Sequence, residues 1–212
     1  MFGGKTMKVS VIIVSHNSEK TISRAIRSAL HQEGIPRTDY EIIVVDNGSE
    51  DLTAKIVSSA FSGQVQLIAL KNNQGLPAAL NKGINNSAGM YIARLDDDDY
   101  YRPKFLSIMM EFLDTNKNYD WVECEHYIID DNENKVGRSD KTLACCIMFR
   151  RHVLESVGLY DEKFWQNETQ DILTRIMQDI RYKDRGAQIK IPLYNWYRRD
   201  GSLTNAGEKG GV

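Results

Sequence analysis

Short apolar runs alternate with amphipathic stretches along the first half of this chain. The runs are rich in β-branched residues and nearly continuous. That pattern is typical of strands that are covered on both faces. The predicted strands occupy 9–14, 42–45, 65–70 and 91–95.

The stretches between these strands predict helices, because their apolar residues recur on one helical face. The first helix follows an N-cap at Asn17 or Ser18 and carries apolar residues as far as Leu30, before Gly34 and Pro36. The next helices are expected at 51–61 and at 77–86, and a further one begins at Pro103.

The second half of the chain has a less regular pattern. It predicts strands, helices and a polar loop whose order is mixed rather than alternating. The strands are expected at 121–129, 144–149 and 188–196, the helices at 151–157 and 171–184, and the loop at 130–140.

Strands that alternate with helices indicate βαβ units with right-handed crossovers. We therefore predict an α/β fold with a Rossmann-like, mixed but mainly parallel sheet flanked by helices. The 212 residues fit one domain. Within it we expect a flexible leader at 1–7, a βαβ half at 8–119, a second half at 120–204 and a flexible tail at 205–212.

Polar clusters follow three of the predicted strands directly. They are Ser15-His16-Asn17, Asp46-Asn47-Gly48 and the four aspartates Asp96 to Asp99. Ligands of parallel α/β sheets bind beyond the carboxyl ends of the strands. We expect these three clusters to meet at one rim and to form a binding site there.

Composition and charge restrict the class of ligand. The formal net charge of −2 gives no argument for nucleic-acid binding, and no apolar run approaches the ~20 residues of a membrane span. Residues 1–6 show no signal-peptide pattern. Cys124, Cys145 and Cys146 cannot all pair within the chain, and buried reduced thiols predict a cytoplasmic protein.

The acidic run Asp96 to Asp99 is the strongest chemical signal in the sequence. Four adjacent carboxylates repel one another, and a hard cation such as Mn²⁺ or Mg²⁺ relieves that repulsion. Such a cation can also hold the phosphate oxygens of a leaving diphosphate. A solvated acidic turn without a ligand is the alternative interpretation.

Other ligand classes fit the sequence less well. An EF-hand loop counted from Asp96 would need Gly and Glu where Tyr101 and Ser107 stand. The chain has no Walker A sequence, and no GxGxxG follows the first strand. Its four histidines have no zinc-ligand spacing with the cysteines.

Four segments of the first half form a combined signature, in order and at fitting intervals: Val9–Asn17, Val44–Asp51, Asn73–Gly83 and Gly89–Asp99. Through them the chain resembles the family 2 glycosyltransferases of the GT-A fold. The resemblance covers most of residues 8–204. The chain is also similar, more weakly, to glycosyltransferase domains of large algal viruses.

This resemblance implies a hexosyltransferase-type, inverting transfer of a sugar from a nucleoside-diphosphate sugar to an acceptor hydroxyl on a glycan. UDP is the favoured nucleotide. Residues 8–119 would bind the nucleotide-sugar, and residues 120–204 would hold the acceptor and the catalytic base. Neither nucleic acid nor a membrane span is expected to take part.

The resemblance also implies roles for the donor-side residues. Asp46 would accept a hydrogen bond from the ring N–H of the base, unless it only caps a turn. Asp98 would be the main ligand of Mn²⁺ or Mg²⁺, with Asp96 as a second ligand. Asp99 is expected only to cap the segment that follows it. The remaining donor contacts are expected from Ser15, His16, Asn17, Gly75, Asn81 and Asp97.

The catalytic base is expected in the segment 168–175. Inverting displacement needs a carboxylate that takes the acceptor's proton. In the family an acidic pair stands here, but this chain has Thr169 as its second member, which leaves Glu168 as first choice and Asp171 as second. The alternative roles are a helix cap for Glu168 and an ion pair of Asp171 with Arg175.

A basic segment near the end lacks the histidine that family members often carry there. Arg198 and Arg199 are expected to neutralise the diphosphate as part of a closing loop, and a solvated basic turn is the alternative.

Two other functions share this layout of residues. One is a nucleotidyltransferase that forms sugar nucleotides, although residues 15–18 lack the Gly-rich, basic loop that such enzymes carry. The other is a non-catalytic domain that binds a nucleotide or a sugar, which Thr169 would allow.

Overall fold

One nine-stranded sheet runs through the computed structural model, which describes residues 7–164 and 167–198. The strand order is β3-β2-β1-β4-β8-β6-β9-β5, and β7 pairs with β6 outside this path. The strands are β1 (Val9–Ser15), β2 (Tyr40–Asp46), β3 (Gln66–Ala69), β4 (Tyr91–Asp96), β5 (Tyr100–Tyr101), β6 (Trp121–Ile129), β7 (Lys135–Ser139), β8 (Ile147–Arg150) and β9 (Gly186–Tyr197).

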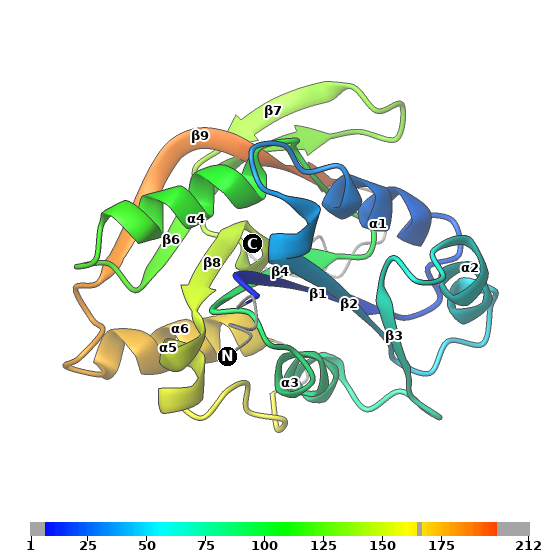
Figure 1. Cartoon of the computed structure of the whole chain (residues 1–212), viewed down its shortest axis with the longest axis horizontal. Coiled ribbons are helices and arrows are strands. Elements are labelled where there is room, and N and C mark those ends of the chain that lie inside the picture. The colour runs from blue at the N-terminus through cyan, green and yellow to red at the C-terminus, as the bar shows by residue number, and fades with distance from the viewer. Residues whose placement is uncertain (1–6, 165–166, 199–212) are drawn as a thin grey trace, which may run out of the picture.

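Helices cover both faces of this sheet. Figure 1 shows α1, α2 and α4 on one face and α3, α5 and α6 on the other. Their bounds are α1 (Ile22–Leu30), α2 (Thr53–Ala60), α3 (Leu76–Asn85), α4 (Phe105–Thr115), α5 (Arg151–Ser156) and α6 (Glu168–Gln178). Two short 3₁₀ turns lie at Arg37–Asp39 and Ala144–Cys146.

The central strands are apolar on both faces because each contributes to two cores. Successive side chains of a strand point to opposite faces. In β1, Val11 and Ile13 pack in the core with α1 and α4, whereas Ile12 packs in the core with α3. The nearly continuous apolar runs in the sequence are a consequence of this double burial, and the predicted α/β fold class is confirmed.

The first four strands along the chain are parallel, and their carboxyl ends are in register. Ser15 at the end of β1 pairs with Asp46 at the end of β2, and Val14 pairs with Asp96 at the end of β4. The three polar clusters therefore follow strands that end at the same edge of the sheet. The sequence pattern predicts this arrangement.

The second half of the chain adds antiparallel pairs and one long strand. β8 lies antiparallel between β4 and β6, and β9 runs parallel to β6. The end of β9 pairs with β5, where Tyr101 faces Tyr194 and Tyr100 faces Asn195. Figure 1 shows β9 curving over the molecule, so that its last residues reach the segment directly after the acidic run.

Some local expectations from the sequence are wrong. The loop expected at 130–140 contains β7, and residues 144–146 form a 3₁₀ turn before β8. Helix α1 begins later than expected, after Thr21, with no side-chain cap. The last helix begins at Glu168 and ends at Gln178, earlier than the expected 171–184.

Within residues 7–164 and 167–198, no helix combines the length and the apolar character needed to cross a membrane.

Gly48 allows two loops to approach each other closely at the carboxyl edge. Its φ is +72°, and a Cβ atom there would lie 2.4 Å from the carbonyl carbon of Asn72. Gly63 has the same φ of +72°, but a Cβ atom there would meet nothing within 4 Å. Both glycines therefore have a backbone conformation that disfavours other residues, but only at Gly48 would a side chain also clash with a neighbouring loop.

We predict that Gly63→Ala lowers the free energy of unfolding by about 1 kcal/mol, the cost of a left-handed alanine. Gly48→Ala should cost ~1–3 kcal/mol more, because the Asn72 backbone must move. Urea denaturation of both variants checks this. Equal losses would mean that the Asn72 loop yields without cost.

Candidate functional site

Two buried oxygen atoms without partners mark the carboxyl edge of β1 and β2. Ser15 is 1% exposed and Asp46 is 2% exposed. Among the described residues, Ser15 Oγ and Asp46 Oδ1 are buried atoms with no hydrogen-bond partner. Buried polar groups are nearly always paired, so an unpaired pair at neighbouring register positions points to a ligand. The other oxygen of Asp46, Oδ2, accepts from Ser49 N–H at 3.3 Å, so the turn-cap role of Asp46 occupies half of its carboxylate.

The loops beside these two atoms hold one another through short hydrogen bonds. Asn17 has a positive φ of 54°, and its Oδ1 accepts from Glu50 N–H at 2.8 Å. The exposed His16 places its Nδ1 3.1 Å from the Asn47 carbonyl oxygen. These contacts hold the segment after β1 against the segment after β2.

Gly75 and Asn81 occupy different surroundings. Gly75 has a φ of 86° and stands just before α3, and its N–H donates to Asn73 Oδ1 at 2.9 Å. Asn81 lies inside α3, and both ends of its amide pair with the backbone of Tyr160, at 2.8 and 3.0 Å. The structure thus gives Asn81 a structural partner, and its predicted donor contact stays a prediction.

The acidic run forms a tight turn, in which Asp99 N–H donates to the Asp96 carbonyl at 3.2 Å. Asp97 is bound to the segment after β1, where its Oδ2 accepts from Ser18 Oγ and from His16 N–H. Burial, together with the charges of Asp98 and Asp96, raises the pKa of Asp97 to about 6 against the opposing effect of these hydrogen bonds. Negative charge is therefore crowded at this turn.

Asp99 fastens the acidic turn to the end of β9. Its Oδ2 accepts from Tyr194 OH at 2.8 Å, and its Oδ1 accepts from Tyr197 N–H at 2.7 Å. The expectation that Asp99 only caps the following segment is therefore wrong, because its bonds reach residues far along the chain. Burial and the neighbouring charges of Asp96 and Asp98 raise the pKa of Asp99 well above its usual range.

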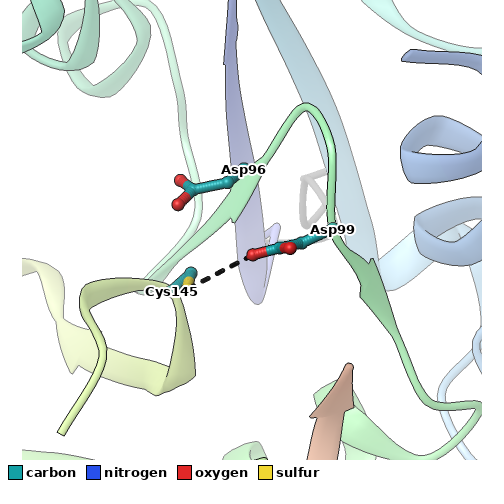
Figure 2. Close-up of side chains that lie close together, drawn as sticks. All are labelled: Asp96, Asp99 and Cys145. Atoms are coloured by element: carbon teal, nitrogen blue, oxygen red, sulfur yellow. Dashed lines mark hydrogen bonds between the residues drawn. The ribbon is translucent and has the colours of Figure 1, made fainter. Parts of the chain in front are cut away.

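A cluster of three groups lies beneath the turn. One carboxylate oxygen each of Asp96 and Asp99 and the sulfur of Cys145 lie within 4.8 Å of one another, as Figure 2 shows. Thiols are soft ligands, whereas Mn²⁺ and Mg²⁺ prefer oxygen. Asp99 is already occupied by Tyr194 and Tyr197. We interpret the three groups as a hydrogen-bonded cluster, in which Cys145 Sγ lies 4.0 Å from Asp99 Oδ2.

Arg94 is a site residue that the sequence analysis does not identify. Its Nε donates to Asp96 Oδ1 at 2.7 Å, and its Nη1 donates to Glu168 Oε1 at 2.9 Å. The guanidinium thus joins the acidic turn to the first residue of α6. A signal for it existed in the sequence, since an arginine inside an otherwise apolar strand, two residues before the aspartates, must find partners.

The structure distinguishes the two carboxylates considered as the base. Glu168 is held by Arg94. The N-cap residue of α6 is Asn167, which makes no side-chain cap bond, so the cap role considered for Glu168 stays a prediction. Asp171 forms the expected i,i+4 ion pair with Arg175, at 2.5 Å. Arg175 also donates to two backbone carbonyls, so this pair anchors α6.

The basic segment is described only at its first residue. Arg198 is exposed, and its backbone N–H donates to the Ile129 carbonyl at 2.9 Å. Arg199 lies outside the described residues, so its predicted contact with the diphosphate is not tested.

Comparison of the sequence with known families and proteins gives a consistent result. The model of the family described as Glycosyl transferase family 2 matches residues 10–177. Succinoglycan biosynthesis protein ExoO of Rhizobium meliloti is 43% identical over 110 residues, which are 52% of this chain and 31% of that protein. An uncharacterised glycosyltransferase of Methanocaldococcus jannaschii is 33% identical over 196 residues, 82% of this chain and 66% of that one. The chain therefore spans about one third to two thirds of the length of these curated relatives.

Solved structures with the same fold come from enzymes that are distant in sequence. S. aureus TarS, residues 1–349 in complex with UDP-GlcNAc, has a TM-score of 0.77 at 23% identity, over 94% of this chain and 61% of that one. The mannosyltransferase PcManGT of Pyrobaculum calidifontis, in complex with GDP-Man and Mn²⁺, has a TM-score of 0.74 at 16% identity, over 94% and 59%. At such identities the likeness establishes the GT-A fold.

Proposed function

This chain belongs to glycosyl transferase family 2 and is a glycosyltransferase of the GT-A fold; from that premise we propose that it transfers a sugar from a nucleoside-diphosphate sugar to an acceptor hydroxyl of a glycan. The transfer inverts the anomeric centre, uses Mn²⁺ or Mg²⁺, and takes a UDP-sugar in preference to other donors. The three cysteines are unpaired and buried, which favours a reducing compartment, and the proposal accordingly locates the reaction in the cytoplasm.

The observation that carries this proposal is the pair of unpartnered oxygens of Ser15 and Asp46 beside the acidic turn. A carboxylate oxygen is a good acceptor for the imide N–H of uracil, and a hydroxyl can donate to a ring carbonyl. The carboxyl edge of β1 and β2 therefore fits a nucleobase, and the neighbouring aspartates after β4 lie where a diphosphate follows it.

The relatives support a nucleotide donor without fixing the base. TarS was solved with UDP-GlcNAc and PcManGT with GDP-Man. Guanine also presents a ring N–H, so Asp46 is compatible with both nucleotides. UDP remains the favoured nucleotide on the resemblance of the sequence segments.

The carboxylates of the acidic turn fit a divalent cation. Burial and the neighbouring carboxylates raise the pKa of both Asp97 and Asp99, so negative charge is concentrated at the turn even though Arg94 pairs with Asp96. Asp98 and Asp96 would hold Mn²⁺ or Mg²⁺, and such an ion, when bound, supplies positive charge to the leaving diphosphate. Asp97 and Asp99 instead hold the turn in place through the segment after β1 and through β9.

Glu168 is proposed as the catalytic base. Its carboxylate takes the proton of the acceptor hydroxyl, and the acceptor oxygen bonds to the anomeric carbon from the face opposite the diphosphate. The bond from that carbon to the diphosphate oxygen breaks, and its electron pair leaves with the nucleotide. Burial would raise the pKa of Glu168, but Arg94 and the hydrogen bonds around it lower it, so Glu168 is ionised at neutral pH.

Incubation of the protein with a panel of sugar nucleotides and Mn²⁺ tests the function. We expect release of the nucleoside diphosphate, fastest with a UDP-sugar, and loss of that release in EDTA. Pyrophosphate-dependent formation of a nucleoside triphosphate would indicate the nucleotidyltransferase instead. Binding of every donor without turnover would indicate a non-catalytic domain.

Asp98→Ala and Cys145→Ser separate the two candidate cation sites. If Asp98 and Asp96 hold the ion, Asp98→Ala should lose Mn²⁺-dependent UDP binding, whereas Cys145→Ser should bind as the wild type does. Titration calorimetry with UDP and Mn²⁺ measures both. The reverse pattern would move the ion to the cluster of Asp96, Asp99 and Cys145.

Glu168→Gln should bind UDP and Mn²⁺ normally and lower kcat by about 10²–10⁴-fold, the usual contribution of a general base. Asp171→Asn is the companion variant, and it should lower the melting temperature while kcat falls much less, because Asp171 anchors α6 through Arg175. Turnover of Glu168→Gln near the wild-type rate would place the base elsewhere.

A further inference from the structure

Arg94 stands between the two halves of the proposed site. It belongs to β4, two residues before Asp96, so both side chains lie on the same face of the sheet. That face is covered by α6, which begins at Glu168. The guanidinium contacts both carboxylates, and its side chain is only 11% exposed.

A third partner completes the surroundings of this guanidinium. Tyr160 is 6% exposed, and its hydroxyl hydrogen-bonds with Arg94. The backbone of Tyr160 is held in turn by the amide of Asn81 from α3. The guanidinium therefore has three partners: Asp96 at the end of β4, Glu168 of α6, and Tyr160, whose backbone is held by α3.

A buried ion pair of this kind is weak support for stability. Removing the Arg94 guanidinium and the Glu168 carboxylate from water has a large cost, and well-packed apolar residues often stabilise a fold more. The neighbouring positions on this face, such as Ile12 and Ile92, are apolar. An arginine that bridges two carboxylates does provide a fixed geometry, because its planar guanidinium sets the directions of both hydrogen bonds.

We infer that Arg94 is a positioning residue, which holds the carboxylate of Glu168 at a set place relative to Asp96 and so aligns the proposed base with the donor side of the site. The inference rests on the proposed function, in which Glu168 takes the acceptor's proton. Arg94 Nε binds Asp96, in the turn proposed to contact the donor, and Arg94 Nη1 binds Glu168, the proposed base. Because both carboxylates bind the same guanidinium, a movement of either one would strain its hydrogen bond to Arg94.

The same contact sets the charge of Glu168. Burial favours the neutral acid, and the Arg94 cation with its hydrogen bond, helped by Thr169 Oγ1, lowers the pKa. Without Arg94, burial would dominate and the pKa of Glu168 would rise. The proton-accepting form would then be lost at a higher pH than in the wild type.

Arg94→Met and Arg94→Lys test the inference, with Arg150→Lys as control. Arg150 is also mostly buried, at the end of β8. It donates to the carbonyls of Tyr119 and Leu113 and forms an ion pair with Asp120 at 3.5 Å, away from the acidic turn of Asp96 to Asp99. For each variant, UDP release from the fastest UDP-sugar gives kcat and its pH profile. Titration with UDP and Mn²⁺ gives the Kd, and thermal melting gives the Tm.

We expect Arg94→Met to lower kcat about 100-fold, the effect of a misplaced reacting group, with a UDP Kd close to that of the wild type. Its acidic limb should move to higher pH. Arg94→Lys keeps a cation, so it should restore the acidic limb but not the full kcat. Arg150→Lys should change the Tm without changing kcat or the pH profile.

Two outcomes overturn the inference. One is a parallel change of kcat and Kd, which would assign Arg94 to donor binding alone. The other is full kcat in Arg94→Met or Arg94→Lys at any Tm, which would assign it a structural role. Glu168→Gln, measured alongside, separates failure of the proposed base from failure of the positioning role. Wild-type turnover in Glu168→Gln overturns both the base assignment and the positioning role. Loss of turnover in Glu168→Gln, together with full turnover in Arg94→Met, overturns the positioning role alone.

Discussion

The parallel register of β1 with β2 and β4 is the constraint on which the candidate site depends. Backbone pairing places Ser15 opposite Asp46 and Val14 opposite Asp96, so the polar residues after each strand begin at one level. The apolar residues before them are buried on both faces and cannot shift by one position without exchanging their faces. Burial of the strands therefore fixes the positions of the polar residues that follow β1, β2 and β4.

The acidic turn shows how the fold holds four adjacent carboxylates. Asp96, Asp97 and Asp99 each have contacts in a different part of the fold. Asp97 is bound by the segment after β1, Asp99 by β9, and Asp96 by Arg94 of β4. Only part of the negative charge is offset in this way, since the pKa of Asp97 and that of Asp99 are still raised. The turn is thus structurally fixed and electrostatically unsatisfied, a combination that suits a cation.

Sequence patterns predict the first half of the fold well and the second half less well. The buried strands and α3 with its early proline are readable because double burial and first-turn proline leave local signals. β7 was missed because it is a mostly exposed edge strand without apolar alternation. The bounds of α6 were missed because its polar first turn, which includes Glu168, is set by tertiary contacts.

The candidate site divides in the same way. Asp46 and the aspartates stand at strand ends, and a sheet rule is enough to bring them together. The roles of Arg94 and Asp99 depend on partners that are 74 and 95 or more positions away, on elements whose placement no local pattern gives. Those partners determine which carboxylates already form hydrogen bonds within the protein.

The bonds of Asp99 to Tyr194 and Tyr197 also concern the order in which the chain is made. The acidic turn lies near the middle of the sequence, but one of its four carboxylates is held by residues close to the end of the described chain. Contacts of such long sequence separation form late, because a large loop must close first. During synthesis, strands β1 to β4 can pair early, while the turn beside them stays unfastened until β9 has left the ribosome. The edge of the sheet exists before the site that it positions is complete.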